Sequence, residues 1–228
     1  MKAMILAAGR GERLRPLTDH TPKPLLPVGG RPLIEHLIAG LAAAGFDDLV
    51  VNLSHLGEQI EKHIGDGQHF GVRIAYSWEA PEPLETGGGI RQALPLLGSG
   101  PFIVVNGDIA TDFPFHRLRN TPERLAHLVM IPNPPHNPAG DFVLSNGELT
   151  TTGAERLTFS GIGVYRPELF NAIEPGRFPL APILRRAMDA RAVSGERHDG
   201  FWMDSGTIER LRAIDEHLGR PPVQQHAG

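Results

Sequence analysis

The chain has 228 residues, 40% of them hydrophobic, which is typical of one large globular domain with a substantial buried core. Its formal net charge of -4, without any basic cluster, argues against nucleic acid as a partner. The absence of cysteine excludes disulfides, thiol catalysis and zinc-thiolate sites, and no apolar run is long enough to span a membrane. We therefore expect a cytoplasmic protein that binds neither nucleic acid nor a membrane.

Strand-like and helix-like segments alternate through the first half of the chain. We expect strands at 3–8, 48–53, 72–77 and 101–106, and helices at 32–44, 56–64 and 88–97. This alternation is the βαβ order of a parallel sheet. The helix at 32–44 has apolar residues three to four positions apart and Gly45 as its C-terminal stop, so its apolar stripe should pack on the sheet.

The second half is less regular. Strands are expected at 126–131, 141–145 and 158–165, helices near 180–190 and 207–218, and a disordered tail at 219–228. Together the elements predict an α/β fold, a single-domain Rossmann-like α/β/α sandwich with a mostly parallel central sheet. Ligands bind such sheets at the carboxyl ends of the strands, so the later loops should supply an acceptor pocket.

The loop that leaves the first strand is rich in glycine and in positive charge. Gly9 and Gly11 allow a tight turn whose backbone N–H groups can point at an anion. Nearby cations are Arg10, Arg13, Arg15 and Lys23. The loop lacks both the Gly-Lys-Ser/Thr of a P-loop and the third glycine of a dinucleotide site, so it predicts a polyphosphate cradle of another kind.

The segment 9–24 resembles the signature of the sugar-phosphate nucleotidyltransferases, roughly Gly-x-Gly-x-Arg-Leu-x-Pro-Leu-Thr followed by Pro-Lys-Pro. The matching residues are Gly9, Gly11, Arg13, Leu14, Pro16, Leu17, Thr18, Pro22, Lys23 and Pro24. Many members have Thr where this chain has Glu12. The resemblance implies the nucleotide-diphospho-sugar transferase fold over 1–218, with the nucleotide held by about 1–110 and the sugar phosphate by about 111–218. Because the chain stops at the end of this core, we expect no C-terminal β-helix and no second activity.

Two carboxylates follow short apolar runs. Asp108 follows the strand at 101–106, and Asp204 lies in Trp202-Met203-Asp204-Ser205-Gly206-Thr207. On their own, these could equally be turn or helix-cap residues. The resemblance implies that both hold one Mg²⁺, and oxygen ligands without His or Cys suit that ion.

The resemblance also implies how the reaction proceeds. A sugar 1-phosphate oxygen is already anionic, so attack on the α-phosphorus of a nucleoside triphosphate needs alignment and neutralised charge, without a general base. The implied catalytic residues are Arg15, Lys23 and Asp108. Loss of Lys23 or Arg15 should cost about 3 to 4 kcal/mol of transition-state binding.

The nucleotide contacts are expected in the first loop and in 78–88, whose Leu84-Glu85-Thr86-Gly87-Gly88 resembles a family motif that selects the base. The predicted nucleotide-binding residues are Ala8, Gly9, Gly11, Glu12, Arg13, Lys23, Glu82 and Gly87. The predicted sugar-phosphate-binding residues are Asn106, Gly140, Glu155, Arg156, Ser160 and Gly161. Arg156 stands where many members have the Lys that binds the sugar phosphate, and it could replace that Lys with a bidentate grip.

The short chain, Glu12, the 84–88 motif and Asn106-Gly107-Asp108-Ile109 most resemble members that transfer a uridylyl group from UTP to N-acetylmuramate 1-phosphate in peptidoglycan recycling. Alternatives within the family use glucose, mannose or N-acetylglucosamine 1-phosphate with UTP, dTTP or GTP. An alternative of another class is a non-catalytic regulatory protein that binds nucleotide sugars, but every expected charged position is present. The lack of an added assembly segment favours a monomer.

Overall fold

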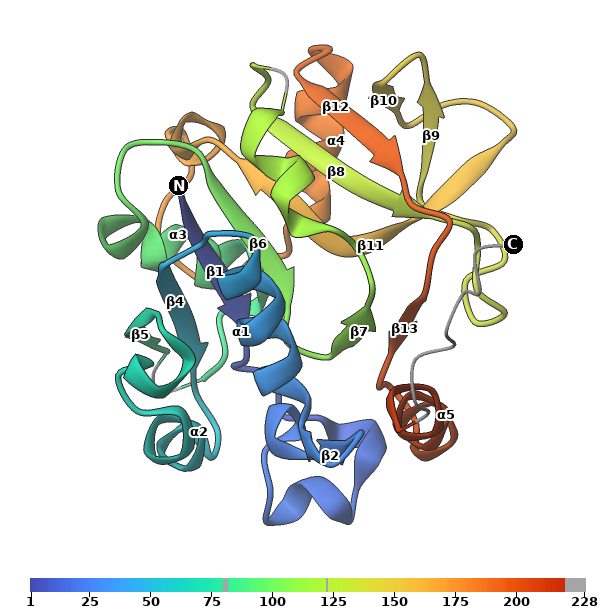
Figure 1. Cartoon of the computed structure of the whole chain (residues 1–228). Helices are drawn as coiled ribbons and strands as arrows, with labels where there is room; N and C mark the ends of the chain where they lie inside the picture. The colour runs from blue at the N-terminus through green and yellow to red at the C-terminus, as the bar shows by residue number, and fades with distance from the viewer. Residues whose placement is uncertain (80–81, 122, 220–228) are drawn as a thin grey trace, which may run out of the picture.

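The apolar runs of both halves join in one sheet of nine strands (Figure 1). The computed structural model describes residues 1–79, 82–121 and 123–219. The strands, in their order across the sheet, are β5 (Arg73–Trp78), β4 (Asp48–Leu53), β1 (Lys2–Leu6), β6 (Phe102–Asn106), β11 (Arg156–Tyr165), β8 (Ala126–Ile131), β12 (Val193–Arg197), β10 (Glu148–Thr150) and β9 (Phe142–Ser145).

The direction of the strands follows from their pairing. β5, β4, β1 and β6 pair in parallel, β11 runs antiparallel to β6 and β8, and β12 pairs in parallel with β8. β10 runs antiparallel to β12 and β9, so only β10 and β11 point opposite to the rest of the sheet. The four strands of the first half are therefore parallel as predicted, but the sheet as a whole is mixed, and each of its antiparallel pairs includes β10 or β11.

Helices cover both faces of the sheet. α1 (Leu33–Ala43) and α2 (Gly57–Ile64) pack in one apolar cluster, which includes Ala3 and Ile5 of β1. α3 (Glu85–Leu97) and α4 (Ala181–Asp189) pack in a second cluster, which includes Met4. Successive residues of a strand point to opposite faces, so a buried strand with helices on both sides is apolar throughout. The predicted α/β/α sandwich is confirmed.

The glycines at the start of α3 are the main departure from the expected helices. α3 begins at Glu85, three residues before the predicted start at residue 88, and so it contains Gly87, Gly88 and Gly89. A Cβ would lie 2.9 Å from the carbonyl oxygen of Phe178 at Gly87 and 3.0 Å from the Asn52 amide nitrogen at Gly89. Tertiary packing therefore overrides the low helix propensity of glycine.

Several short elements were not predicted from the sequence because they are too short to show a period. β7 (Ile109–Thr111) pairs with β13 (Trp202–Asp204), and β2 (Pro27–Val28) pairs with β3 (Arg31–Pro32). α5 (Ile208–Leu218), which follows β13, confirms the helix predicted near 207–218. The 3-10 helices are η1 (Glu12–Leu14), η2 (Leu17–Asp19), η3 (Lys23–Leu25), η4 (Gln68–Phe70), η5 (Phe115–Asn120) and η6 (Pro167–Phe170).

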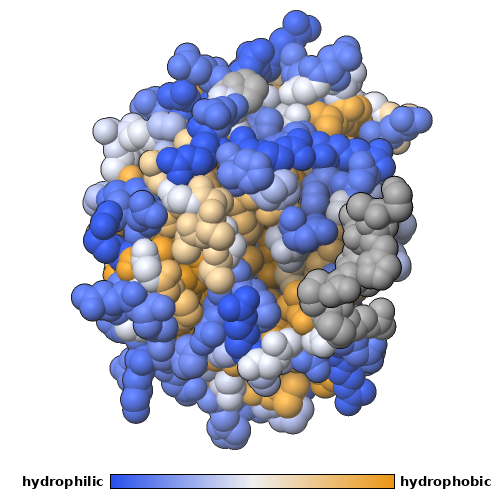
Figure 2. Space-filling view, viewed as in Figure 1, coloured by the Kyte–Doolittle hydropathy of each residue, from blue (hydrophilic) through white to orange (hydrophobic). Residues whose placement is uncertain are grey.

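Hydrophilic residues cover most of the face shown in Figure 2, and hydrophobic ones gather around α1 and in the hollow beside it. Among the described residues, no helix is both long and apolar enough to cross a membrane. The proposed halves at about 1–110 and 111–218 both contribute strands to the one sheet, and the functional division between them stays a prediction. Of the expected tail, 220–228 lies outside the described residues.

Candidate active site

A cavity of about 510 Å³ opens where β1 and β6 end. The glycine-rich loop forms one wall, and the turn after β6 forms the floor. The cavity brings together eight of the predicted site residues, which are Ala8, Gly9, Gly11, Glu12, Arg13, Lys23, Asn106 and Asp108. This position is the carboxyl edge of a parallel sheet, where α/β proteins bind ligands.

Gly11 fixes the path of the loop. Its φ of 65° lies in the left-handed region, and a Cβ there would be 2.9 Å from Cγ2 of Thr18 and 3.3 Å from Cβ of Lys23. The Thr18 hydroxyl donates to the Gly11 carbonyl at 2.9 Å. The glycine is therefore required so that the loop can pack closely against the segment that carries Lys23.

Lys23 lies at the floor of the cavity. Its ammonium group is 2.6 Å from Oδ2 of Asp108, and the residue as a whole is only 8% exposed. About a third of the Asp108 side chain is exposed, toward the same cavity that both residues line. A nearly buried cation paired with a partly exposed carboxylate can be redirected to a bound phosphate oxygen, because Lys carries three donors on a flexible stem.

Arg13 of the signature and Arg15, at one of its variable positions, have different surroundings. Arg13 lines the cavity, whereas Arg15 does not. The Arg15 side chain is 63% exposed, and its Nε lies 3.1 Å from Oδ1 of Asp19. In this structure Arg15 therefore stands apart from Lys23 and Asp108, and its catalytic role stays a prediction.

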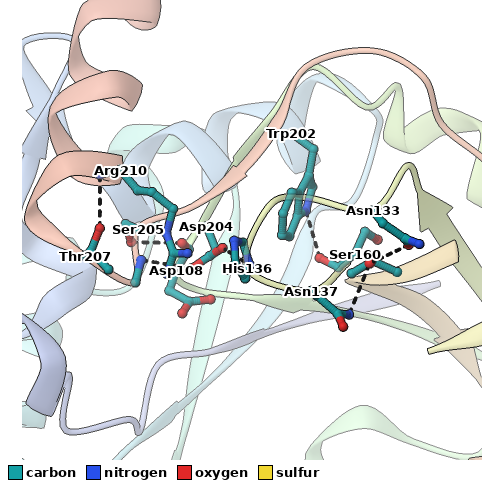
Figure 3. Close-up of polar contacts among 12 residues, drawn as sticks. Asp108, Asn133, His136, Asn137, Ser160, Trp202, Asp204, Ser205, Thr207 and Arg210 are labelled. Carbon is teal, nitrogen blue, oxygen red and sulfur yellow. Dashed lines mark hydrogen bonds and ion pairs between the residues drawn. The ribbon is translucent and has the colours of Figure 1, made fainter. Parts of the chain in front are cut away.

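Asp204 is brought next to Asp108 by the pairing of β13 with β7. The register places Asp204 opposite Ile109, and the N–H and hydroxyl of Ser205 both donate to the carbonyl oxygen of Asp108, at 2.7 and 2.9 Å. Figure 3 shows the Asp204 carboxylate beside Arg210 and His136, with Asp108 close by. The two predicted metal ligands thus come from distant parts of the sequence to neighbouring segments, although only Asp108 lines the cavity.

The two oxygens of Asp204 have unequal partners. Oδ1 accepts hydrogen bonds from the Gly206 N–H and pairs with Nη2 of Arg210, both at 2.9 Å. Oδ2 lies 3.1 Å from Nε2 of His136, but it is buried and accepts no hydrogen bond from the part of the chain that the structure describes. One oxygen of this carboxylate is therefore left with capacity to accept a further partner.

The cavity is also lined by two buried residues that the sequence analysis did not single out, Asn52 and, within the predicted segment 78–88, Glu79. Oδ1 of Asn52 accepts the Ala7 N–H at 2.7 Å, and its amide donates to Glu79 at 2.7 Å. The other oxygen of Glu79 accepts the Leu84 N–H at 2.6 Å. Both side chains line the cavity and are 3% exposed. The sequence contains one signal for Asn52, which is a polar residue near the end of the apolar run 48–53.

The residues predicted to select the base lie elsewhere. Glu82 points to Arg177, at 3.6 Å, and Gly87 packs against Phe178. Neither lines the cavity, whereas Pro83, Glu85 and Thr86 of the same segment do. Residues 80 and 81 of the predicted base-binding segment lie outside the described residues.

The predicted sugar-phosphate residues are only partly brought together. Asn106 lines the cavity and packs on Gly161, whose φ is 79° and where a Cβ would be 3.0 Å from Cβ of Asn106. The Ser160 hydroxyl donates into the sheet, to the Val129 carbonyl at 2.7 Å. Ser160 therefore has no free donor toward the cavity in this structure.

The other three residues lie at the starts of β9 and β11, and none of them lines the cavity. Gly140 packs against Asn133 and the backbone of Arg156, and Glu155 is exposed. The Arg156 guanidinium donates to the Thr151 carbonyl at 3.0 Å. Arg156 is thus turned toward the loop between β10 and β11, and its role in phosphate binding stays a prediction.

A second cavity, of about 420 Å³, lies between α1, β7 and η5 and contains none of the predicted site residues. His36 is in its wall, and burial lowers the pKa of this imidazole below its ordinary value. None of the chemistry expected from the sequence therefore falls in this second cavity.

Comparison with known proteins identifies the family. The model of the nucleotidyl transferase family matches residues 2–142. The N-acetylmuramate alpha-1-phosphate uridylyltransferase of Neisseria meningitidis serogroup B is 55% identical over 96% of this chain and 99% of that protein. The chain belongs to the nucleotidyl transferase family. The family and the transferase class predicted from the sequence are therefore confirmed.

Other relatives agree with this assignment. The Caulobacter vibrioides protein of the same description is 33% identical over 95% of this chain and 96% of its own length. A crystal structure from Bacillus anthracis, provisionally described as a glucose-1-phosphate thymidylyltransferase, superposes with a TM-score of 0.84 over 97% of this chain and 96% of that one, at 23% identity. At that identity the superposition shows the fold alone, and it confirms the predicted nucleotidyltransferase architecture.

Proposed function

We propose that this nucleotidyl transferase condenses UTP with N-acetylmuramate 1-phosphate to give the UDP-sugar and pyrophosphate. The observation that carries the reaction class is the pairing of Lys23 with Asp108 beneath the glycine-rich loop, in a cavity of about 510 Å³. The choice of these two substrates rests on the uridylyltransferases that are similar to the chain over nearly its whole length.

The chain's own groups supply alignment and positive charge. An oxygen of the sugar 1-phosphate attacks the α-phosphorus of UTP, and the bond from that phosphorus to the β-phosphate oxygen breaks. The attacking oxygen is already anionic, so no proton has to be removed. Lys23 is placed to bind the α-phosphate and the incoming phosphate together, while Arg13 and the N–H groups of the Gly9–Arg13 loop neutralise the departing pyrophosphate.

Asp108 and Asp204 would hold the Mg²⁺ that the family resemblance implies. Both offer hard carboxylate oxygens, and the buried Oδ2 of Asp204 has no hydrogen-bond partner among the described residues, so the pair fits such an ion. No group of three or more His, Cys, Asp or Glu residues suited to a metal occurs in the described ranges. Substrate oxygens and water would therefore complete the coordination. The ion would neutralise charge on the reacting phosphates.

The residues near the uracil and near the sugar are proposed separately. Asn52 and Glu79 fix the backbone at Ala7 and Leu84, so they shape the end of the cavity where the uracil would lie. Asn106, packed on Gly161, is the predicted sugar contact that reaches the cavity. Gly140, Glu155, Arg156 and Ser160 would act only by shaping the rim or after a change in side-chain direction.

The test is pyrophosphate release from purified protein with Mg²⁺. UTP, dTTP, CTP and GTP are each combined with N-acetylmuramate, N-acetylglucosamine, glucose and mannose 1-phosphates. Asp108→Asn is the inactive variant, and Asp189→Asn, an exposed Asp at the end of α4, is its matched control. Turnover with UTP and N-acetylmuramate 1-phosphate that is lost in D108N alone would support the proposal.

Other outcomes would be equally informative. Preference for another pair would keep the reaction class and overturn the substrate. Binding of UDP-N-acetylmuramate without pyrophosphate release from any pair would favour the regulatory alternative. The predicted monomer is checked by light scattering coupled to size exclusion, and the predicted cytoplasmic location by fractionation of the producing cell.

A further inference from the structure

Arg13 and Gly206 line the active-site cavity, and Arg210 approaches Arg13 across Gly206 from behind this lining. Gly206 is buried. A Cβ at this position would overlap Nη2 of Arg210 and Oδ1 of Asp204, and it would lie 3.1 Å from Nη2 of Arg13. Two guanidinium groups, one from the glycine-rich loop and one from α5, therefore meet at Gly206.

Only one of these two cations has a carboxylate partner in the described part of the chain. Arg210 pairs with Oδ1 of Asp204 at 2.9 Å, whereas Arg13 forms no ion pair within residues 1–79, 82–121 and 123–219. His136 approaches the other oxygen of Asp204 at 3.1 Å, so the cluster contains more basic groups than acidic ones. Like charges held this close repel one another unless an anion lies between them. The cluster therefore favours the binding of a further anion.

Arg210 also has an unused donor. Its side chain is only 18% exposed, and its buried Nε has no hydrogen-bond acceptor among the described residues. The Arg210 backbone is fixed at the start of α5, where its N–H donates to the Thr207 hydroxyl at 3.3 Å. A guanidinium with free donors on a fixed backbone is suited to the bidentate grip of a phosphate.

We propose that Arg210, together with Arg13, binds a phosphate group of the substrates during uridylyl transfer. The inference rests on the proposed function, because that reaction brings four phosphate groups to this cavity. Arg210 would also supply a cation near Asp204, whereas Arg156 donates to the Thr151 carbonyl. Arg210 was not among the residues predicted from the sequence, since an Arg in the first turn of a helix resembles a solvated charge.

The phosphate could come from two sources with the same chemistry, the pyrophosphate portion of UTP or the 1-phosphate of the sugar. Calorimetry on purified wild type and Arg210→Gln, with Mg²⁺ present, separates the two. One titration uses inorganic pyrophosphate, and the other uses N-acetylmuramate 1-phosphate. Arg212→Gln is the matched control, because Arg212 is an exposed arginine on the same helix.

We expect R210Q to weaken at least one of the two ligands by about tenfold or more, as for loss of a charge-assisted hydrogen bond, while R212Q leaves both unchanged. Weaker pyrophosphate binding alone would assign Arg210 to the triphosphate, weaker sugar-phosphate binding alone to the 1-phosphate, and weakening of both to a bridging position. Arg210→Lys keeps the charge without the fork, so it should lie between wild type and R210Q.

Two results would overturn the inference. Either R210Q binds both ligands like wild type, or it changes only the Mg²⁺ concentration needed for turnover, which would make Arg210 a positioning residue for Asp204. Thermal unfolding of R210Q, R210K and R212Q shows whether the fold is intact, and R210K supplies the comparison if R210Q does not fold. Failure of wild type to turn over UTP and N-acetylmuramate 1-phosphate would contradict the proposed function instead, because the binding measurements do not depend on turnover.

Discussion

Replacement of Asn52 by Leu should destabilise the protein and weaken UTP binding together. The side chain is 3% exposed and joins two parts of the site, since it accepts the Ala7 N–H and donates to Glu79, both at 2.7 Å. Leu keeps a similar size but leaves both partners unpaired, at about 1 to 3 kcal/mol each. Water can reach the cavity that these residues line, so we expect a total near the lower bound, about 2 to 3 kcal/mol.

A double-mutant cycle with Glu79→Gln tests whether this loss comes from the pair. The Glu79 carboxylate accepts one hydrogen bond on each oxygen, from Asn52 and from the Leu84 N–H. A Gln has only one acceptor oxygen, so E79Q alone loses one of these bonds. In the N52L background the Asn52 donor is absent, so a single acceptor oxygen at position 79 is enough for the remaining Leu84 N–H. E79Q should therefore cost less there, with a coupling of about 0.5 to 3 kcal/mol.

The measurements are urea unfolding for stability and initial rates for function, with Asn171→Leu as an exposed control. Asn52 lies apart from Lys23 and Asp108, so KM for UTP should rise while kcat at saturation changes little. The reasoning is refuted if N52L is no more destabilising than N171L, or if the two substitutions add to within about 0.5 kcal/mol.

Three further predictions concern the loop, the sheet and the tyrosines. Arg13→Gln should lower kcat/KM by about 100-fold or more. Arg15→Gln breaks only an exposed pair with Asp19, so its kcat/KM should stay within about threefold of wild type. Equal losses of kcat/KM in the two variants would instead support the catalytic role predicted for Arg15. Gly161→Ala should destabilise the fold by about 2 kcal/mol or more, because the φ of Gly161 is 79° and a Cβ there would displace Asn106. Gly100 has open space around it, so Gly100→Ala should leave the thermal unfolding temperature nearly unchanged. Burial raises the pKa of Tyr76 to about 12 and raises the pKa of Tyr165 as well. The two tyrosines therefore contribute stability that is fully present below pH 10.0 and is lost as pH rises toward 12. Phenolate absorbance that appears near pH 10 in the folded protein would contradict this prediction.

Much of the fold could be predicted because its signals are local and regular. The strands at 48–53 and 126–131 have the bounds that their apolar runs predict, since a buried parallel strand is apolar on both faces. Gly45, with a φ of 78°, follows the end of α1 as its sequence position predicts. Short elements such as β7 and β13 escaped detection because three residues cannot show a period, and their pairing is specified only by the rest of the fold.

The site was predicted in part for the same reason. The residues of the glycine-rich loop and Asp108 lie next to each other because they follow β1 and β6, which are neighbours in the sheet. Asn52 and Glu79 carry no motif, and they were missed because their role depends on hydrogen bonds to the backbone of other segments. The direction of a side chain is equally invisible in the sequence, so it could not be foreseen that Glu82 points to Arg177 and Arg156 to the Thr151 carbonyl.

Arg13 and Arg15 illustrate the physical limit most clearly. Both are Arg, both lie in one loop, and the residue between them is the buried Leu14. In a regular strand, residues two apart would share a face. Here Gly11 is left-handed and the 3-10 turn Glu12–Leu14 follows it, so Arg13 lines the cavity while Arg15 turns outward to Asp19. The path of the loop depends on the packing of Thr18 and Lys23 against Gly11, and this contact decides which of the two charges reaches the cavity.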